Sequence, residues 1–282
     1  MTELYIALQR ILPQILLGRG VHWLARLRVP WLKDALINGF VRLYGVDVDE
    51  AEHPVPAGYA SFNDFFTRRL QPGARPQEPD KAATISPADG RVQQAGAIEG
   101  NQLIQAKGLS YSVAELLGEP AAEATYQDGW FISIYLAPSN YHRFHAPLTG
   151  TLRNLYYVPG QRFAVNETTA GALPGLFARN ERLVCHFESP AGPYALVLVG
   201  ALNVASISTS WAGEVLPREP REPCRWHYPG RAGIELQRGD EVGHFNLGST
   251  VILLLPPGAV IPEPGLTPGA VLRMGQRIAG PA

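Results

Sequence analysis

The chain has 282 residues, of which 46% are hydrophobic and 17% charged, and its formal net charge is −1. A chain of this length buries about two-thirds of its unfolded surface, so its core needs no disulfide or metal, and the composition excludes a disordered chain. The charge lacks the cationic excess of nucleic-acid-binding proteins, and we expect no nucleic-acid partner. Cys185 and Cys224 are too few for a disulfide framework.

The first 46 residues are both basic and apolar. They contain six cations and two anions, a net charge of +4, whereas the rest of the chain has a net charge of −5. Apolar residues recur on one face of a helical period at Leu4, Leu8, Ile11, Leu12, Ile15 and Leu16. Pro13 falls inside this run, and we expect it to end or kink the helix.

A second amphipathic helix is predicted between Pro30 and Gly45. Proline is favoured in the first turn of a helix, and glycine just after the last. The apolar period of this helix runs through Leu32, Leu36, Phe40, Leu43 and Tyr44, while Tyr5, Trp23 and Trp31 add aromatic rings with polar tips.

This segment does not read as a membrane span, because Arg10, Arg19 and Arg26 interrupt the run of about 18 apolar residues that a span requires. A secretory signal also fits poorly, since Pro13 breaks the run and no small-residue cleavage site follows. Two interpretations stay open from the pattern. The helical hairpin lies in a membrane interface, attracted by apolar burial and anionic lipid, or it packs on the domain that follows.

The remainder of the chain is rich in β-like runs. Ser61 and Asp64 form a capping pattern before a short helix, and residues 71–80, with three prolines, indicate an extended linker and a boundary near Asp80. Strands are predicted at 130–136, 152–158, 194–199, 204–208 and 251–255, with a short helix at 113–117. The predicted fold class is α+β, with N-terminal amphipathic helices in residues 1–80 and a mainly antiparallel β barrel or sandwich in residues 81–282.

Three segments contain residue types suited to catalysis. The first is Gly248-Ser249-Thr250, which leads into the apolar run 251–255 and places a hydroxyl on a tight turn at the edge of the core. An ordinary turn, in which the serine bonds its own backbone, is the commoner explanation. No glycine lies two residues after Ser249, so this is not the nucleophile elbow of an α/β hydrolase.

The second segment contains His142 and His145, which follow the predicted strand 130–136. Imidazoles titrate near neutral pH, so either side chain suits proton transfer, although two histidines in a surface loop are the commoner case. Carboxylates and cysteines at the spacing of a metal site are missing around them, and we expect no metal.

The third segment is Asp89-Gly90, a dipeptide that most often marks a hairpin turn. A carboxylate on a rigid turn is also able to orient an imidazole. Asp89, His145 and Ser249 therefore supply the carboxylate, base and hydroxyl of a catalytic triad, although each residue alone is weak support.

Several short motifs occur in an order that is specific when they are taken together. They are Pro-Ala-Asp-Gly at 87–90, Tyr-Leu-Ala-Pro at 135–138, Tyr-His-Arg-Phe-His at 141–145, Phe-Ala-Arg-Asn-Glu-Arg at 177–182, Trp-Ala-Gly at 211–213 and Leu-Gly-Ser-Thr at 247–250. With these motifs the chain resembles the bacterial phosphatidylserine decarboxylase family, whose members depend on a pyruvoyl group. The similarity extends from Ile11-Leu12-Pro13 to Arg273-Met274-Gly275-Gln276, with no departure at the matching catalytic positions.

The resemblance implies a proenzyme that cuts itself between Gly248 and Ser249. The serine hydroxyl attacks the preceding carbonyl, and the amide becomes an ester. β-elimination then breaks the chain. Hydrolysis by water, with loss of ammonia, leaves a pyruvoyl group at residue 249. Residues 1–248 and 249–282 then form two chains, which the buried run 251–255 would hold together. The β-rich part is the catalytic domain.

The resemblance also implies roles for the site residues. His145 acts as the base toward Ser249, Asp89 orients His145, and His142 is the candidate for substrate positioning or the proton step. The pyruvoyl group, derived from Ser249, is the cofactor. Phosphatidylserine forms a Schiff base with it, loses CO₂ and becomes phosphatidylethanolamine, a step of phospholipid biosynthesis.

A lipid substrate favours the interfacial interpretation of the hairpin. The expected partners are phosphatidylserine, an anionic membrane surface and the chain's own cleaved fragment. The expected location is peripheral, on the cytoplasmic face of the bacterial cell membrane. We also expect residues 163–165 and 173–177 to extend the apolar contact. The oligomeric state stays open, with a homodimer among the options.

Two other functions remain open from the residues. One is a non-enzymatic, β-rich lipid-binding protein that uses the same hairpin. The other is a hydrolase in which Ser249, His145 and Asp89 act on an external ester.

Overall fold

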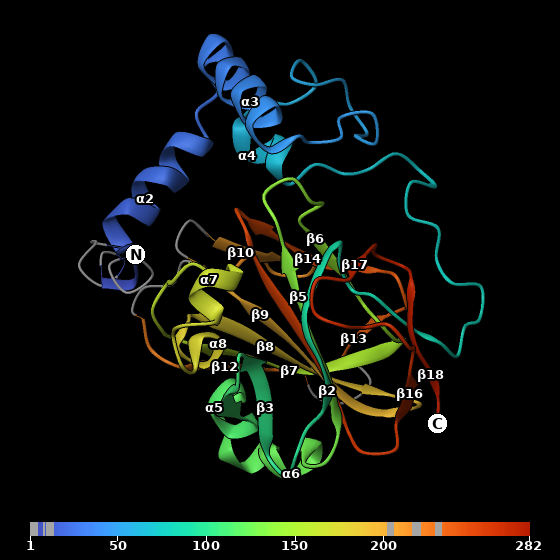
Figure 1. Ribbon diagram of the computed structural model, residues 1–282. Helices are drawn as coiled ribbons and strands as arrows, with labels where there is room; N and C mark the ends of the chain where they lie inside the picture. Colours follow the sequence, from blue (N-terminus) through green and yellow to red (C-terminus); the bar gives the residue numbers. More distant parts are fainter. Residues whose placement is uncertain (1–4, 8, 10–13, 202–205, 216–220, 229–232) are drawn as a thin grey trace.

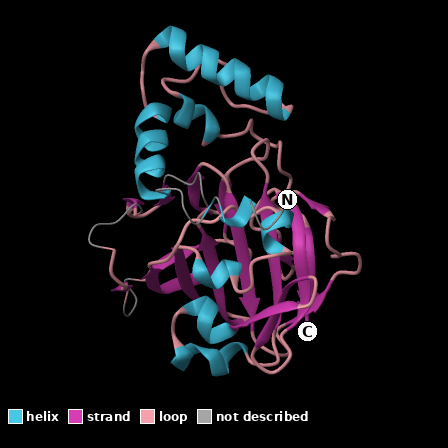
Figure 2. Ribbon diagram, turned by 60° about the vertical axis from the view of Figure 1, so that its left-hand side comes forward, coloured by secondary structure: helices cyan, strands magenta, loops and turns pink. Residues whose placement is uncertain are grey.

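The computed structural model describes residues 5–7, 9, 14–201, 206–215, 221–228 and 233–282. Its longer helices lie at one end of the molecule, beside the sheets (Figures 1 and 2). They are α2 (Gln14–Ala25) and α3 (Pro30–Tyr44), followed by the short α4 (Phe62–Phe66). Other short helices connect strands: α5 (Val113–Leu117), η1 (Pro120–Ala122), α6 (Glu123–Tyr126), α7 (Glu167–Ala170) and α8 (Leu176–Arg179).

The largest sheet among the described residues has nine antiparallel strands. In spatial order they are β12 (Cys224–His227), β7 (Gly150–Val158), β8 (Arg182–Ser189), β9 (Gly192–Val199), β15 (Ser249–Leu255), β5 (Trp130–Leu136), β2 (Gly90–Ala97) and β17 (Val271–Leu272), with β13 (Ile234–Leu236) also paired to β7.

Smaller antiparallel sheets complete the β-rich part. One has the order β11 (Gly213–Glu214), β10 (Ser206–Thr209), β14 (Glu241–Asn246) and β6 (Arg143–His145); another has β1 (Thr84–Ile85), β18 (Arg277–Pro281) and β16 (Val260–Pro262); β3 (Gln102–Ala106) pairs with β4 (Leu109–Ser112). Within the described ranges no sheet closes into a barrel. The predicted α+β class is therefore confirmed, in its sandwich-like form.

Strand β15 lies in the interior of the large sheet. It pairs with β5 from Ser249 opposite Leu136 to the end of the strand, and with β9 from Thr250 opposite Val199. All seven of its residues are buried. The strand is thus held by hydrogen-bonded ladders on both edges and by packing on both faces.

Several local predictions agree with the structure. Strand β5 and helix α5 have their predicted bounds, and Gly45 ends α3 in the left-handed conformation. The hydroxyl of Ser61 accepts a hydrogen bond from the backbone N–H of Asp64 at 3.2 Å. Strand β15 begins at Ser249, earlier than the apolar run 251–255, because the ladder with β5 already includes this residue.

The first predicted helix cannot be compared throughout, because Leu4, Leu8, Arg10, Ile11, Leu12 and Pro13 lie outside the described residues, as do positions 204–205 of a predicted strand. Helix α2 nevertheless extends to Ala25, well past the apolar run. Gly18 and Gly20 have low helix propensity, which explains why the pattern did not predict this extension.

The apolar residues of α2 and α3 divide between packing and exposure. Ala25 and Ile37 are buried, and the Phe40 ring lies edge-on against Phe62 of α4. Nevertheless, nine of the twelve exposed large hydrophobic side chains in the described part precede residue 45. They are Tyr5, Leu16, Leu17, Trp23, Leu24, Val29, Trp31, Leu43 and Tyr44. The hairpin therefore packs on α4 and also presents an apolar surface, and none of the described helices is long and apolar enough to cross a bilayer.

The expectation that residues 163–165 and 173–177 extend this surface is wrong. Phe163, Val165, Leu173, Leu176 and Phe177 are each at most 3% exposed and belong to the main core. Their hydrophobicity is used to pack the sandwich.

Replacing Leu253 by Ala tests the central place of β15. This fully buried side chain lies in the middle of the strand, and its truncation is expected to lower the free energy of unfolding by about 2–5 kcal/mol. Ile261→Ala, on a side chain that is 63% exposed, is the control, with an expected change below about 1 kcal/mol. Urea unfolding measures both, and equal losses would contradict the assignment.

Candidate active site

The turn that leads into β15 has an unusual backbone. Leu247 has a φ of 93° and Gly248 a φ of 26°. Glycine tolerates positive φ, whereas a leucine there costs on the order of 1–3 kcal/mol. The Leu247 side chain packs with Ala25 and Phe66, and these contacts help to hold the turn. Strain is therefore stored directly beside the Gly248–Ser249 peptide bond.

Ser249 occupies the first position of β15 and is fully buried. Its Oγ has no hydrogen-bond partner, so the hydroxyl does not bond its own backbone as in an ordinary turn. Leaving a buried hydroxyl unpaired costs about 1–3 kcal/mol. The unpaired hydroxyl therefore lowers the stability of the fold and has its lone pairs and proton available.

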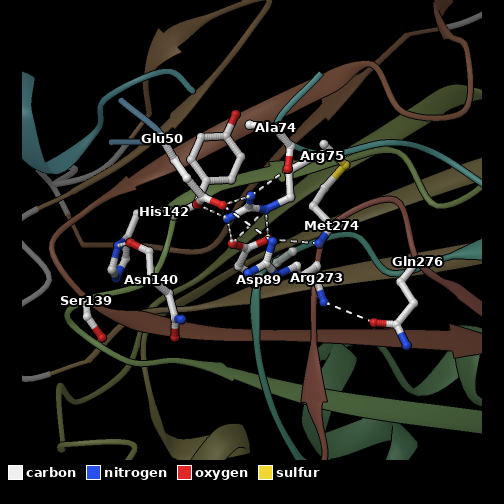
Figure 3. A network of polar contacts seen from close by, with 12 residues as sticks. Glu50, Ala74, Arg75, Asp89, Ser139, Asn140, His142, Arg273, Met274 and Gln276 are labelled. Carbon is white, nitrogen blue, oxygen red and sulfur yellow. Dashed lines mark hydrogen bonds and ion pairs between the residues drawn. The ribbon is translucent and has the colours of Figure 1, made fainter. Parts of the chain in front are cut away.

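Asp89 immediately precedes β2 and is held by several donors (Figure 3). Arg75 donates from Nε to Oδ1 at 2.8 Å and from Nη2 to Oδ2 at 2.5 Å, and the backbone N–H of Met274 donates to Oδ1 at 2.8 Å. No hairpin forms here, since β2 pairs with β5 and β17. Glycine is required at position 90 because the backbones of β2 and β5 approach closely here. A Cβ at this position would lie 2.3 Å from the carbonyl oxygen of Tyr135.

Glu50 binds the other side of the Arg75 guanidinium. Nη1 donates to Oε1 at 2.9 Å and Nη2 to Oε2 at 2.7 Å. Burial opposes the charge of Arg75, but the hydrogen bonds to Asp89 and Glu50 outweigh it and raise the pKa of Arg75. The same hydrogen bond lowers the pKa of Glu50. Arg75 is therefore a permanent cation that fixes the position of Asp89.

His145 ends β6, and both of its ring nitrogens have partners. Nδ1 lies 2.9 Å from the carbonyl oxygen of Gly239, which only accepts, so Nδ1 carries the proton. Nε2 therefore accepts from the Tyr141 hydroxyl at 3.1 Å. Burial lowers the pKa of His145. The ring is a neutral imidazole whose basic nitrogen contacts Tyr141.

His142 differs from His145 in having a free basic nitrogen. Its Nδ1 donates to the carbonyl of Asn140 at 2.8 Å, whereas Nε2 is buried without a partner. The centroid of the Phe66 ring lies 4.0 Å from that of the imidazole. Burial, and then the charge of Arg68, lowers the pKa of His142 to about 3. A neutral acceptor is thus available in an apolar environment.

The predicted site residues lie at the same end of the large sheet. Ser249 pairs with Leu136, and Arg91, close to Asp89, pairs with Tyr135. Asp89 and Ser249 therefore flank the end of β5, with their backbones two strand spacings, roughly 10 Å, apart.

The expected chain of hydrogen bonds from Asp89 through His145 to Ser249 is not formed. The backbone N–H of His145 donates to Pro87 at 2.7 Å, which brings its segment next to that of Asp89. However, the Asp89 carboxylate contacts Arg75, and the His145 ring contacts Tyr141 and Gly239. The structure places Asp89 and His145 on adjacent segments, and no hydrogen bond links either side chain to Ser249.

The sequence interpretation missed Arg75, Glu50 and Tyr141. Arg75 belongs to the segment 71–80, interpreted as a linker, yet its side chain is only 8% exposed. No local spacing distinguishes it from a solvated linker charge, because its role depends on contacts with distant residues. Tyr141 belongs to the motif at 141–145, and its hydroxyl contacts the ring nitrogen of His145 that carries no proton.

Within the described ranges, no cluster of three or more metal-ligating side chains is present. The geometry does fit a covalent group derived from Ser249, because that hydroxyl is buried, unpaired and adjacent to a strained turn. The reacting atom would then lie at the start of β15. The strand before it, β14, contacts the segment that carries both histidines, because the backbone N–H of Phe245 donates to the carbonyl of His142 at 3.0 Å.

Comparisons with known proteins identify the family. The family model described as Phosphatidylserine decarboxylase matches residues 62–280, and one described as PSD matches residues 4–45. The chain belongs to the phosphatidylserine decarboxylase family. It is 50% identical over 279 residues to a phosphatidylserine decarboxylase proenzyme of Azotobacter vinelandii, covering 98% of this chain and 97% of the relative. It is 46% identical over 276 residues to the proenzyme of Methylococcus capsulatus, covering 97% and 95% respectively. The resemblance inferred from the motifs is thereby confirmed.

Buried histidines predict how stability depends on pH. Burial lowers the pKa of His142, His145 and His186, while unfolded histidines titrate near 6.5. Below that pH the unfolded chain binds more protons than the folded chain, so the free energy of unfolding falls as pH falls. We expect the contribution of His142 to approach about 1.4 kcal/mol per pH unit between pH 6 and 4, measured by urea unfolding of a Ser249→Ala chain.

The control for this prediction is a pair of further variants. His142→Gln in the Ser249→Ala chain should reduce the slope by about one proton, and His227→Gln, at an exposed side chain, is the matched substitution for comparison. A slope that does not respond to His142→Gln would contradict the neutral, buried state of this ring.

Proposed function

We propose that the chain is a proenzyme that cuts itself between Gly248 and Ser249 and then decarboxylates phosphatidylserine to phosphatidylethanolamine in phospholipid biosynthesis. Curated relatives that cover nearly the whole chain are named phosphatidylserine decarboxylase proenzyme. The observation that carries the self-cutting step is the buried, unpaired hydroxyl of Ser249 beside the strained turn at Leu247.

Self-cutting requires a nucleophile close to the bond that breaks. The Oγ of Ser249 and the carbonyl carbon of Gly248 are separated by only a few bonds, so attack forms a small ring and no docking step is needed. The hydroxyl loses its proton, the amide becomes an ester, and elimination leaves the serine oxygen on Gly248. Breaking the chain also releases the strain of the turn.

His145 is proposed as the base toward Ser249. Its Nε2 carries the lone pair, and the Tyr141 hydroxyl that now occupies it must either move aside or pass the proton on. Asp89, anchored by Arg75, supplies a negative charge that favours the imidazolium form of His145. Asp89 thus acts through its field and through the position of its segment.

His142 is proposed as a substrate-positioning residue in decarboxylation. Its pKa of about 3 suits a neutral hydrogen-bond acceptor better than a group that stores a proton. The pyruvoyl group formed from Ser249 supplies an electrophilic carbonyl that accepts the electron pair left behind by CO₂. The free Nε2 of His142 is available to an N–H or O–H of the substrate headgroup.

The two pieces of the cut chain are expected to remain associated. Residues 249–282 contribute β15 to the interior of the sheet, and Met274 and Arg273 contact Asp89 and Glu50 of the larger piece. Pairing of two such cut chains as a homodimer stays a prediction, which light scattering tests.

The exposed apolar surface of α2 and α3 supports a membrane-associating role for residues 1–80, with residues 81–282 as the catalytic domain. Basic residues in the first 46 positions favour an anionic surface, and such lipids are abundant in the cytoplasmic leaflet. We therefore propose peripheral attachment on the cytoplasmic face of the bacterial membrane.

Substitution of Ser249 by Ala is expected to give a chain that stays uncut and has no decarboxylase activity. Asp89→Asn and His145→Ala should slow cutting by about 100-fold or more, whereas His227→Ala should cut normally. Gel electrophoresis of freshly synthesised protein over time measures the rate.

Normal cutting in both Asp89→Asn and His145→Ala would remove their assigned roles. An uncut wild-type chain whose Ser249 reacts with a fluorophosphonate would instead favour the hydrolase, and an uncut, unreactive chain that binds vesicles would favour the lipid-binding protein.

Replacing Trp31 and Leu43 together by Gln tests the membrane surface. These side chains are 73% and 75% exposed, and their loss is expected to weaken binding to phosphatidylserine-containing vesicles by 10-fold or more. Ile261→Gln with Val271→Gln is the matched control, since those side chains are 63% and 61% exposed on β16 and β17. If both double variants sediment equally with vesicles, α2 and α3 serve only to pack on the rest of the protein.

A further inference from the structure

Arg68 is a buried cation whose hydrogen-bonding capacity is largely unused. It lies just beyond α4 and is 4% exposed, and its Nη2 donates to the carbonyl of Ser139 at 3.2 Å. Its Nε and Nη1 are buried and have no partner. The guanidinium carbon also lies 5.2 Å from the centre of the Phe65 ring. A buried charge with unpaired donors is costly unless the site receives an acceptor.

Another buried arginine shows what a purely structural side chain looks like in this fold. Arg182 is 2% exposed, and its Nε, Nη1 and Nη2 all donate to backbone carbonyls, including those of Leu116 and Glu115. Arg68 has no comparable set of acceptors. The difference indicates that the partner of Arg68 is not part of the folded chain.

Arg68 lies close to the candidate active site. Its charge contributes to the lowered pKa of His142, and it contacts the loop that carries Ser139. Arg68 also lines a cavity of about 340 Å³ together with Arg69, Arg143 and Tyr59. The Tyr59 hydroxyl is likewise buried and unpaired. Glu52 and Asp64 line the cavity as well, and Arg69 and Arg143 are already ion-paired with Glu241. Arg68 therefore differs from these two arginines in having donors without a partner.

We propose that Arg68 binds the phosphodiester of phosphatidylserine while the serine headgroup reacts at residue 249, an inference that rests on the function proposed above. A planar guanidinium with two free N–H directions matches the oxygens of a phosphate. Binding would supply the acceptor that Nε and Nη1 lack.

The substrate carries two anions, and the chemistry favours the phosphodiester over the carboxylate. A cation paired with the carboxylate would stabilise the ground state and lose its partner as CO₂ departs, which raises the barrier. The phosphodiester keeps its charge throughout the reaction and in the product. A buried arginine therefore assists binding without opposing the chemical step.

The position of Arg68 along the expected lipid path agrees with this choice. Phe62, at the start of α4, lines an apolar groove of about 390 Å³ with Leu247 and residues of α2 and α3. Phe66, at the end of α4, contacts His142. Arg68 follows Phe66 by two residues, so a lipid whose acyl chains occupy the groove would bring its phosphate close to this end of α4.

The test compares substrate and product binding in the processed enzyme. Arg68→Gln is expected to raise both the KM for dihexanoyl phosphatidylserine and the Kd for dihexanoyl phosphatidylethanolamine, measured by calorimetry, by about 10–100-fold. The kcat should change much less. Arg68→Lys, which keeps the charge, should recover part of the affinity, and Arg277→Gln, on an exposed ion pair of β18, is the charge-matched control.

The outcomes separate the alternatives. A raised KM with an unchanged Kd for the product would place Arg68 on the carboxylate and overturn the proposal, as would no change in either constant. Inorganic phosphate that binds wild type as tightly as the lipid, with the same dependence on Arg68, would indicate a free-phosphate site and also overturn it.

A ligand variant covers the case in which Arg68→Gln does not fold. Dihexanoyl phosphatidylethanolamine with a methylated, uncharged phosphate should bind wild type at least 10-fold more weakly than the diester. Equal binding would contradict the proposal. A wild-type chain that is not cut or does not decarboxylate would contradict the proposed function instead, so the two failures are distinguishable.

Discussion

The structure depends on one constraint, which is that the Gly248–Ser249 bond lies at the point where a strained turn enters a fully buried strand. The ladders with β5 and β9 fix Ser249 on the C-terminal side of the bond, while the packing of Leu247 fixes the other side. Both sides are held, so the turn cannot relax while the bond is intact. The packing of the sandwich therefore maintains the strained backbone of Leu247 next to the Gly248–Ser249 peptide bond.

Ion pairs and hydrogen bonds at this site join residues from the N-terminal and C-terminal parts of the chain. Glu50, Arg75 and Asp89 form a continuous ion-paired network, to which residues 273–274 contribute from the C-terminal segment. Removing one member of this largely buried network leaves another charge uncompensated, which destabilises the fold. The network therefore positions Asp89 and also joins the segments on either side of the proposed cut.

Much of the fold was predictable because local patterns and tertiary structure agree. The apolar run at 130–136 predicted β5, and Pro30 and Gly45 predicted the ends of α3. The motif residues Asp89 and Ser249 also flank the same end of β5, but the hydrogen bonds of Asp89 and His145 were not predictable. Those bonds depend on Arg75 and Tyr141, whose roles arise from long-range contacts that no local spacing encodes. The exposed apolar surface of α2 and α3 likewise required the structure, since the pattern fitted packing equally well.

The most direct test of the central claim is the mass of the small fragment in purified wild-type protein. The account predicts two chains, residues 1–248 and 249–282, with the smaller one lighter by one ammonia than the peptide that begins with serine and blocked to Edman degradation. A single chain of 282 residues, or a fragment that begins with an unmodified Ser249, would contradict it.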